Sequence, residues 1–273
     1  MAESNFQQQR FELKYRIRDE VALAVRDFVQ GYLIPDEFSE GKEDFSYPVH
    51  SVYLDSDDMY LYHTTLNSDK NRFKLRMRFY DDAPEKPIFF EIKRRMNRII
   101  AKQRGGVKRE AVPWILAGHL PEAEHLTSDN PKQLVAIQDF SKLMSRLGAV
   151  PKAHVAYMRE AWMSPYDNSA RVTMDRSVKC EPELVTKLAT YMDKPVSVFA
   201  EQVTLELKFT GRFPIWFREL VRVFGLVQCG AAKYVEGVTL SGQHNYVSGT
   251  SSEPRRGDEE INWDDFASQA RAV

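Results

Sequence analysis

The chain has 273 residues, of which 43% are hydrophobic and 28% charged, a balance typical of a globular protein with a substantial core. Its net charge of -1 excludes a globally basic protein, so any anion binding has to arise from local clusters of cations. Its two cysteines match no zinc or redox spacing and no run of about 18 apolar residues occurs, so we expect a reduced, cytoplasmic chain without a membrane span.

The first half of the chain predicts strands separated by turns and short helices. Residues 10–17 alternate apolar and charged side chains, which is the period of a half-buried strand. A helix is expected from Asp19, its N-cap, to about Tyr32, and a second from Asp57 to about Leu66, capped by Ser56. Further strands are expected over residues 49–55, 71–80, 88–95 and 99–108.

The second half adds longer helices and three more strands. Many antiparallel strands with a few inserted helices indicate one α+β domain, residues 10–247, built on a barrel-like sheet. We expect residues 1–9 to be flexible and residues 248–273 to form a polar tail. Within this tail, residues 263–272 are a candidate for a short helix. Helices are expected over 111–118, 131–147 and 214–224, and strands over 153–163, 170–177 and 203–210.

The strand expected at residues 71–80 carries the most informative pattern in the chain. Its even-numbered residues from Arg72 to Arg78 are basic, and its odd-numbered residues from Phe73 to Phe79 are apolar. Because successive side chains of a strand point to opposite faces, four cations share one face. If the apolar face packs under outer helices, the cations line the inside of the sheet, which makes physical sense only if a polyanion binds there.

The same alternation recurs in other strands. The simplest alternative is a sandwich whose charged faces point to water, because antiparallel sheets commonly expose one polar face. Two features favour an inward orientation. Like charges on neighbouring strands repel unless an anion or a metal lies between them, and the arginine fork suits phosphate. The pairs that share a charged face are Glu12 with Lys14, Glu91 with Lys93, Lys102 with Arg104, and Glu206 with Lys208.

Six short motifs follow one another along the chain: Glu12-Leu13-Lys14, Lys74-Leu75-Arg76-Met77-Arg78, Glu91-Ile92-Lys93, Lys102-Gln103-Arg104, Glu206-Leu207-Lys208 and Lys233-Tyr234. In this order they resemble the triphosphate tunnel metalloenzymes, the CYTH-like superfamily. Within that group the chain is most similar to the VTC domain, the polyphosphate polymerase domain of the vacuolar transporter chaperone complex.

This resemblance implies an eight-stranded antiparallel β-barrel tunnel with helices packed outside, and a bound Mn²⁺ or Mg²⁺. It also implies transfer of the γ-phosphate of ATP to a growing inorganic polyphosphate chain. Carried over to this sequence, the catalytic residues would be Arg76, Arg78, Lys93, Arg159 and Lys233. The phosphate-binding residues would be Lys14, Lys74, Lys102, Arg104, Arg171 and Lys208. The metal ligand would be Glu206, with Glu12 and Glu91 as secondary candidates.

Other functions and partners remain open from the sequence. A tunnel hydrolase acting on triphosphate or polyphosphate, or a non-catalytic polyphosphate-binding module, would use the same residues. ATP and inorganic polyphosphate are the expected partners. Nucleic acid is not expected, because the aromatic residues alternate to the face opposite the bases. A separate membrane partner and the oligomeric state stay open.

The sequence favours structural roles for several conspicuous residues. Tyr15, Tyr53 and Tyr157 are expected to be packing residues, Asp55 is expected to cap a helix, and none of the six histidines is assigned a catalytic role. In the position where the wider superfamily has the first Glu of Glu-x-Glu-x-Lys, this chain has Arg10, which removes one metal ligand and favours use of a single metal.

Overall fold

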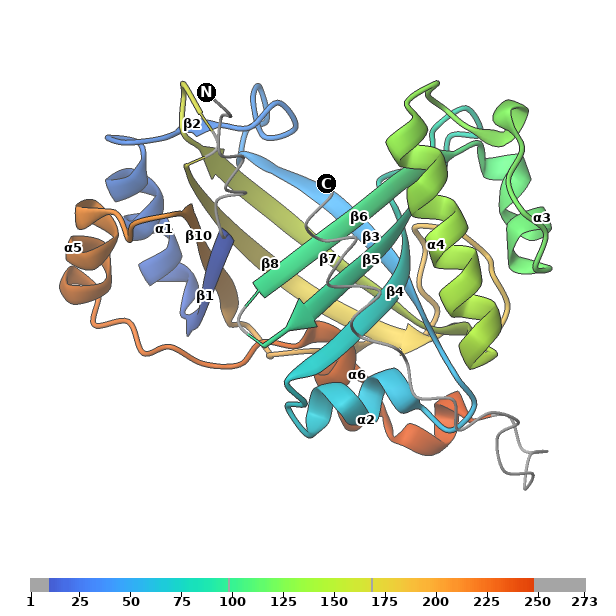
Figure 1. The fold of residues 1–273 in the computed structure, drawn as a ribbon. Helices are drawn as coiled ribbons and strands as arrows, with labels where there is room; N and C mark the ends of the chain where they lie inside the picture. Colours follow the sequence, from blue (N-terminus) through green and yellow to red (C-terminus); the bar gives the residue numbers. More distant parts are fainter. Residues whose placement is uncertain (1–9, 98, 168, 248–273) are drawn as a thin grey trace.

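The computed structural model describes residues 10–97, 99–167 and 169–247, and shows an α+β fold with one large antiparallel sheet (Figure 1). The strands are β1 (Arg10–Ile17), β2 (Ile34–Pro35), β3 (Ser46–Asp55), β4 (Asn71–Phe79), β5 (Ile88–Met96), β6 (Ile99–Val107), β7 (Val150–Met163), β8 (Ala170–Pro182), β9 (Val196–Ser197) and β10 (Val203–Thr210). The helices are α1 (Asp19–Val29), α2 (Tyr60–Leu66), α3 (Val112–Leu116), α4 (Pro131–Leu147), α5 (Ile215–Val223) and α6 (Lys233–Ser241), with 3-10 turns η1 (Arg109–Ala111), η2 (Ala123–His125) and η3 (Gln243–Tyr246).

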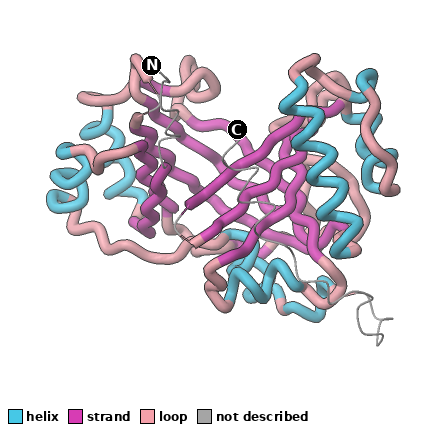
Figure 2. Tube along the Cα trace, in the orientation of Figure 1, coloured by secondary structure: helices cyan, strands magenta, loops and turns pink. Residues whose placement is uncertain are grey.

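The strands, magenta in Figure 2, form one large sheet. The sheet follows the order β1-β10-β8-β7-β3-β4-β5-β6, and every pair along this path is antiparallel. The short strand β2 pairs with β7, and β9 pairs with β8. The register places Lys74 opposite Lys93, and Arg76 opposite Glu91. Because residues directly opposite one another share a face, the charged faces of neighbouring strands are continuous across the sheet.

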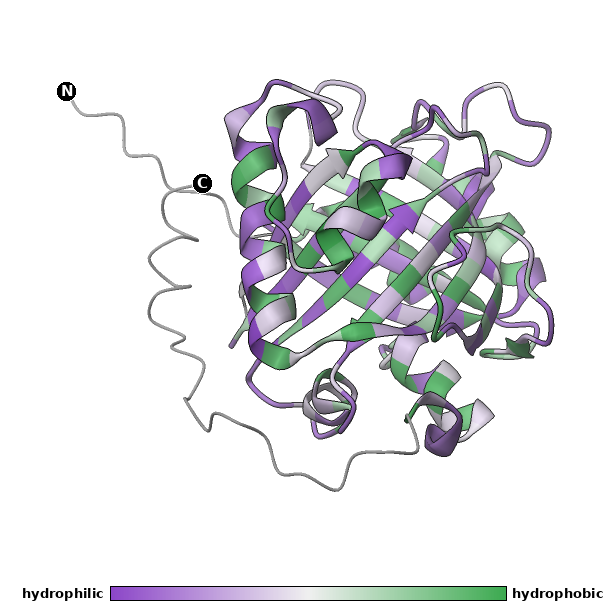
Figure 3. Cartoon of the chain, turned by 90° about the vertical axis from the view of Figure 1, so that its right-hand side faces the viewer, coloured by the Kyte–Doolittle hydropathy of each residue, from purple (hydrophilic) through white to green (hydrophobic). Residues whose placement is uncertain are grey.

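The apolar faces of the strands point outward and are covered by helices. On β4 and β5 the apolar residues pack against Ile137 and Phe140 of α4. On β1, β8 and β10 they pack against Val25 of α1 and Phe217 of α5. The alternation is visible as hydrophobic and hydrophilic bands along the strands (Figure 3). This arrangement confirms the inward orientation of the charged faces over the sandwich with solvated charged faces.

Within the described residues, no strand pairing closes the sheet into a hydrogen-bonded barrel, so closure of the expected tunnel is not confirmed. The edge strands β1 and β6 come within 8 Å between Cα atoms but do not pair. Other segments occupy their edges instead. Cys229 donates its backbone N–H to the carbonyl of Lys14 at 2.9 Å, and Thr127 donates to the carbonyl of Gly106 at 3.2 Å. Backbone groups already bonded to these segments are not available to close the barrel.

The helix α6 was not predicted from the sequence. Its segment contains Val235, Val238, Thr239 and Gly237, residue types with low helix propensity. Tertiary packing stabilises it, since Val235 and Val238 join an apolar cluster with β3, β7 and β8. A Cβ atom at Gly237 would lie 2.5 Å from Sγ of Cys180, so the glycine permits the close approach of α6 to β8.

Asp55 links α2 to α6, and its expected role at the start of a helix is confirmed. Its carboxylate accepts backbone N–H groups of Ser56, Leu61 and Tyr62 and the hydroxyl of Tyr234, each at 2.8 Å. These bonds satisfy donors at the first turn of α2, which lies beside α6 in Figure 1.

Some element boundaries differ from the prediction. The helix α2 begins at Tyr60 rather than Asp57, because Met59 has a left-handed backbone with φ of 58°. Asp19 is the first residue of α1 and pairs with Arg176 at 2.7 Å, so its assignment as N-cap was wrong. The strand β8 extends to Pro182, beyond the expected end at residue 177. Residues 1–9 and 248–273, for which a flexible start and a polar tail are predicted, lie outside the described residues.

Replacing Gly105 by alanine is expected to lower stability by about 1–3 kcal/mol, the usual cost of overpacking. An added Cβ would lie 2.5 Å from the carbonyl oxygen of Gln133 and 2.5 Å from Cγ1 of Ile137, both in α4. Thermal unfolding followed by circular dichroism measures the change. In the matched control Gly31→Ala the nearest atom is 3.6 Å away, and a shift within about 0.5 kcal/mol is expected. Equal losses in both variants would contradict the packing argument.

Candidate functional site: the cationic inner face

Seven strands of the main path, α6 and the loop after β2 bring charged side chains to the inner side of the sheet. We call this set the cationic inner face. It combines eleven cations with five carboxylates. The cations are Lys14, Lys74, Arg76, Arg78, Lys93, Lys102, Arg104, Arg159, Arg171, Lys208 and Lys233, and the carboxylates are Glu12, Asp36, Glu91, Asp175 and Glu206.

Contacts between strands that are not neighbours show that these side chains face one another across the interior. Lys93 of β5 lies 3.0 Å from Glu12 of β1, although neither strand pairs with the other. Arg78 of β4 donates to the hydroxyl of Tyr157 of β7 at 3.1 Å, across the intervening strand β3. The charged face therefore encloses a shared space instead of spreading over a flat surface.

Glu91 is the centre of the first charge cluster. Its side chain is fully buried, and Arg76 contacts its Oε2 through Nε at 2.7 Å and through Nη2 at 2.5 Å. Lys102 lies 2.7 Å and Arg104 3.6 Å from Oε1, and Arg78 lies 3.9 Å from Oε2. Burial opposes ionisation, but these cations outweigh it and hold the pKa of Glu91 well below its ordinary value. One carboxylate thus offsets part of the charge of four cations.

The second cluster joins β1 and β10. The Lys14 ammonium lies 3.1 Å from Glu12 and 3.1 Å from Glu206, so both carboxylates share one cation. Lys208 lies 2.6 Å from the other oxygen of Glu206, and Thr173 donates to that oxygen at 3.3 Å. Burial lowers the pKa of Lys208 to about 8, although Glu206 opposes this shift.

The third cluster is centred on Asp175 of β8. Arg159 forms a two-point contact with its carboxylate at 2.7 and 2.8 Å, and Lys233 of α6 approaches to 2.7 Å. Burial would raise the pKa of Asp175, but these two cations lower it to about 2. Lys233 also lies 3.9 Å from Glu206, which connects this cluster to the second.

Lys74 differs from the other lysines of the inner face. Among the described residues its ammonium has no carboxylate within ion-pair distance. Burial lowers its pKa well below the ordinary value, and the neighbouring cations Lys14, Lys93, Arg72 and Arg76 lower it further. The protonated form of Lys74 is therefore disfavoured until an anion reaches this part of the inner face.

The structure brings all fourteen predicted site residues to this one face, where their functional roles remain predictions. It also adds residues that the sequence reasoning assigned no function. Asp175 lies in the strand 170–177, so the alternation could have placed it beside Arg171 and Thr173. Asp36, which pairs with Arg171 at 2.7 Å, follows a short loop strand without a recognisable pattern.

Two tyrosines expected to serve in packing also contact the charged groups. The hydroxyl of Tyr53 accepts a hydrogen bond from Arg76 at 3.1 Å, and its ring stacks on Tyr234 with centroids 4.9 Å apart. Lys233 lies 5.0 Å from the ring centroid of Tyr157, within the range of a cation–π contact. Both rings therefore orient cations in addition to packing.

The carboxylates of the inner face fit a divalent ion only in part. Glu12 and Glu206 share the Lys14 ammonium and so lie close together, which suits an ion held by one or two carboxylates and by substrate phosphates. Glu91 fits a metal ion less well, because four cations already surround it. Among the described residues, three metal-ligating side chains come together at a different place, where the ligand atoms of His154, Glu181 and Glu183 all lie within 4.8 Å of one another.

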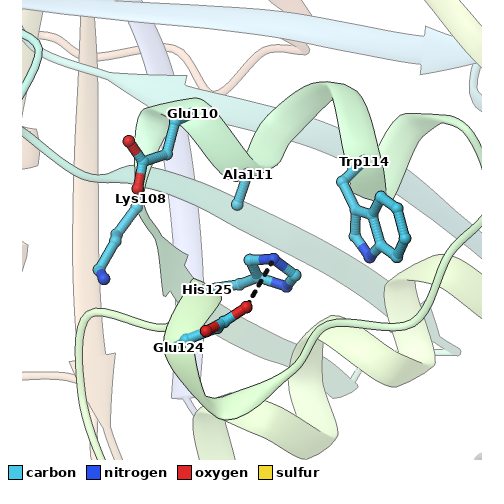
Figure 4. A pocket seen from close by; sticks show the side chains of 6 residues that line it. All are labelled: Lys108, Glu110, Ala111, Trp114, Glu124 and His125. Atoms are coloured by element: carbon cyan, nitrogen blue, oxygen red, sulfur yellow. Dashed lines mark ion pairs between the residues drawn. The ribbon is translucent and has the colours of Figure 1, made fainter.

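A hollow of about 410 Å³ lies apart from the inner face, beside η1, α3 and η2 (Figure 4). Its lining includes one lysine, Lys108, against two glutamates, Glu110 and Glu124, with His125 and Trp114 nearby. The acidic balance of this lining disfavours a polyanion. The cationic inner face remains the better candidate for a phosphate ligand.

The protein is an α+β domain in which an antiparallel sheet, covered outside by helices, carries a cationic inner face. The chain belongs to the VTC domain family, whose model matches residues 9–241. A comparison with curated protein sequences gives no match. Among the described residues, no helix is long and apolar enough to cross a membrane.

Two solved structures, each described as a "putative adenylate cyclase", are similar to the chain. The one from Bacillus halodurans is 14% identical with a TM-score of 0.45, and the match covers 82% of this chain and 94% of that chain. The one from Vibrio parahaemolyticus is 10% identical with a TM-score of 0.41, and the match covers 86% of this chain and 99% of that chain.

Asp175→Asn is expected to destabilise the protein by about 2 kcal/mol or more at pH 7, because one pKa unit corresponds to about 1.4 kcal/mol. The pKa of Asp175 is lowered from 3.8 to about 2, so its stabilising effect is present above about pH 4 and is lost as the pH falls through 2. Urea unfolding at several pH values should therefore show the difference from wild type shrinking between about pH 4 and 2.

The control for this prediction is Asp193→Asn. Asp193 pairs with Lys187 at 2.9 Å, but both side chains are more than half exposed, and such surface pairs contribute about 0–1 kcal/mol. A loss in Asp175→Asn no larger than in this control would show that the buried cluster does not stabilise the fold.

Proposed function

We propose that the protein is a polyphosphate polymerase that transfers the γ-phosphate of ATP to a growing inorganic polyphosphate chain on the cationic inner face. The imbalance of eleven cations against five carboxylates carries this proposal. A linear polyphosphate is a repeating anion, and it could neutralise the excess positive charge along the strands. Membership of the VTC domain family supports phosphate substrates.

Within this face, Arg78 and Lys74 are the cations best placed to bind phosphate in the proposed reaction. Arg78 has hydroxyl partners, Ser51 at 3.4 Å and Tyr157 at 3.1 Å, and its nearest carboxylate oxygen is 3.9 Å away. Lys74 lacks a carboxylate partner among the described residues. Both can therefore engage an anion without first breaking a short ion pair. Arg76 and Arg159, which are tightly paired, would hold the surrounding geometry.

The proposed chemistry needs positioning and charge neutralisation rather than a side-chain nucleophile. A terminal phosphate oxygen of the acceptor is already anionic, so no general base is required to activate it. The guanidinium of Arg78 and the ammonium of Lys74 would reduce repulsion between acceptor and donor phosphates and stabilise the charge of the transferred group. Mn²⁺ or Mg²⁺ held by Glu206 and Glu12 would offset charge on the triphosphate.

The activity is tested by incubating the protein with ATP and Mn²⁺ and separating the products on a polyphosphate gel. A ladder of polyphosphate is the expected result. Arg78→Met is expected to reduce its formation by about 100-fold or more, as for removal of one stabilising donor from a transition state. Lys86→Met, at an exposed position in the β4–β5 turn, should retain activity.

Other products would redirect the assignment. Free phosphate without a ladder would identify a hydrolase, in which water replaces the polyphosphate acceptor. Tight polyphosphate binding without turnover would identify a binding module. Full polymer formation by a folded Arg78→Met variant would overturn the role proposed for the inner face.

Lys74→Met should weaken binding of inorganic tripolyphosphate by roughly tenfold, equivalent to about 1.4 kcal/mol, without destabilising the fold. Removing Lys74 leaves no buried carboxylate without a partner and relieves repulsion among neighbouring cations. Because an anion raises the pKa of Lys74, wild type should also take up protons on binding. Calorimetry in buffers of different ionisation enthalpy measures this uptake, which should decrease in the variant.

The exposed Lys86→Met variant serves as the control for affinity and proton uptake. Unchanged affinity in Lys74→Met would place the tripolyphosphate away from β4. A large loss of thermal stability would contradict the repulsive environment described for Lys74.

A further inference from the structure

A second group of titratable side chains lies on the other face of the sheet, outside the cationic inner face. His154 of β7 is in register with Val52 of β3, whose side chain belongs to the apolar cluster under α4. In the pairing of β7 with β8, His154 lies opposite Glu181. Glu183 follows two residues later, and its backbone N–H donates to the carbonyl of Lys152 at 2.9 Å. The sheet itself therefore brings the three side chains together.

All three side chains are buried. His154, Glu181 and Glu183 are 0%, 5% and 3% exposed, and their candidate ligand atoms all lie within 4.8 Å of one another. Two carboxylates at this separation repel in a medium of low dielectric unless a proton or a cation lies between them.

Backbone donors hold an oxygen of each carboxylate in place. Glu183 Oε1 accepts from the N–H of Lys187 at 2.7 Å, and Glu181 Oε2 accepts from the N–H of Lys194 at 2.9 Å. The other oxygen of Glu183 lies 3.8 Å from His154 Nδ1, beyond hydrogen-bond distance.

The Nδ1 atom of His154 independently indicates a missing ligand. This buried atom has no hydrogen-bond partner among the described residues, while Nε2 lies 3.0 Å from Nδ1 of His50. Coordination through Nδ1 requires the proton of His154 on Nε2, and His50 Nδ1 is placed to accept it. An outer hydrogen bond of this kind is what fixes the tautomer of a metal-binding histidine.

We propose that His154 Nδ1, Glu181 and Glu183 form a binding site for a divalent transition metal ion, separate from any metal on the cationic inner face. One imidazole nitrogen with two carboxylate oxygens suits Zn²⁺ or Mn²⁺ better than Mg²⁺ or Ca²⁺, which prefer ligand sets made of oxygen alone. Further positions would be filled by water.

The bound ion would have a structural role. Residues 183–194 leave the sheet at this site and reach the β4–β5 turn, where Thr190 donates to Asp82 at 2.6 Å. The same segment accepts a hydrogen bond at Leu188 from Arg109 at 2.7 Å. An ion held by β7, β8 and Glu183 would fasten the start of this segment to the sheet.

The test uses the full-length protein after removal of metal by a chelator, with Zn²⁺ as the probe. Calorimetric titration in the absence of ATP and polyphosphate is expected to show one bound equivalent, because an ion on the inner face would also need substrate phosphates as ligands. Thermal unfolding should shift to higher temperature on saturation. Glu183→Gln keeps the shape of the side chain and should lose both effects, as should His154→Asn. Glu206→Gln alters the inner face only and should retain both.

Three results would overturn the proposal: no zinc bound by wild type, zinc bound unchanged by a folded Glu183→Gln variant, or zinc lost in Glu206→Gln alone. The first would mean that a shared proton neutralises the group. The last would place the ion on the cationic inner face. Far-ultraviolet circular dichroism of each stripped variant separates loss of the ligand from loss of the fold, and Glu181→Gln provides a second isosteric variant if His154→Asn fails to fold.

Discussion

Repulsion among closely spaced cations is the constraint on which the rest of this structure depends. Two unit charges 4 Å apart interact by about 4 kcal/mol at an effective dielectric constant of 20, so the inner face cannot collect cations without a counter-charge. Glu91, Asp175 and Glu206 supply part of it, and each contacts at least two cations. The remaining imbalance favours an anion from outside the chain.

The fold holds this repulsive arrangement in place from the opposite side. Each strand buries apolar residues under α1, α4 or α5, and this burial stabilises the sheet irrespective of the charges. The period of two in the sequence couples the two faces, so residues cannot slip by one position without placing cations in the core. From the inner side, α6 contributes Lys233 and an aromatic stack between Tyr234 and Tyr53.

The alternation in the sequence predicted the main strands and which of their side chains share a face. The like charges on those faces favoured the inward orientation, and Arg159, Arg171 and Lys233 came from the family resemblance. The alternation worked because the period of a strand depends on local geometry alone. Partners that come from distant segments could not be predicted in this way. Asp36 meets Arg171 through a loop, and α6 forms because β7 and β8 provide an apolar surface for a segment of low helix propensity. The open seam between β1 and β6 likewise depends on the segments that cover these edges.

Those edge contacts have a consequence for association between copies of the chain. An uncovered edge strand presents a row of backbone donors and acceptors to which another molecule can add a strand. Cys229 uses the carbonyl of Lys14, and Thr127 uses that of Gly106, so parts of both edges are already satisfied within the same molecule. The sheet can thus remain unclosed, with less of its backbone open to intermolecular β-aggregation.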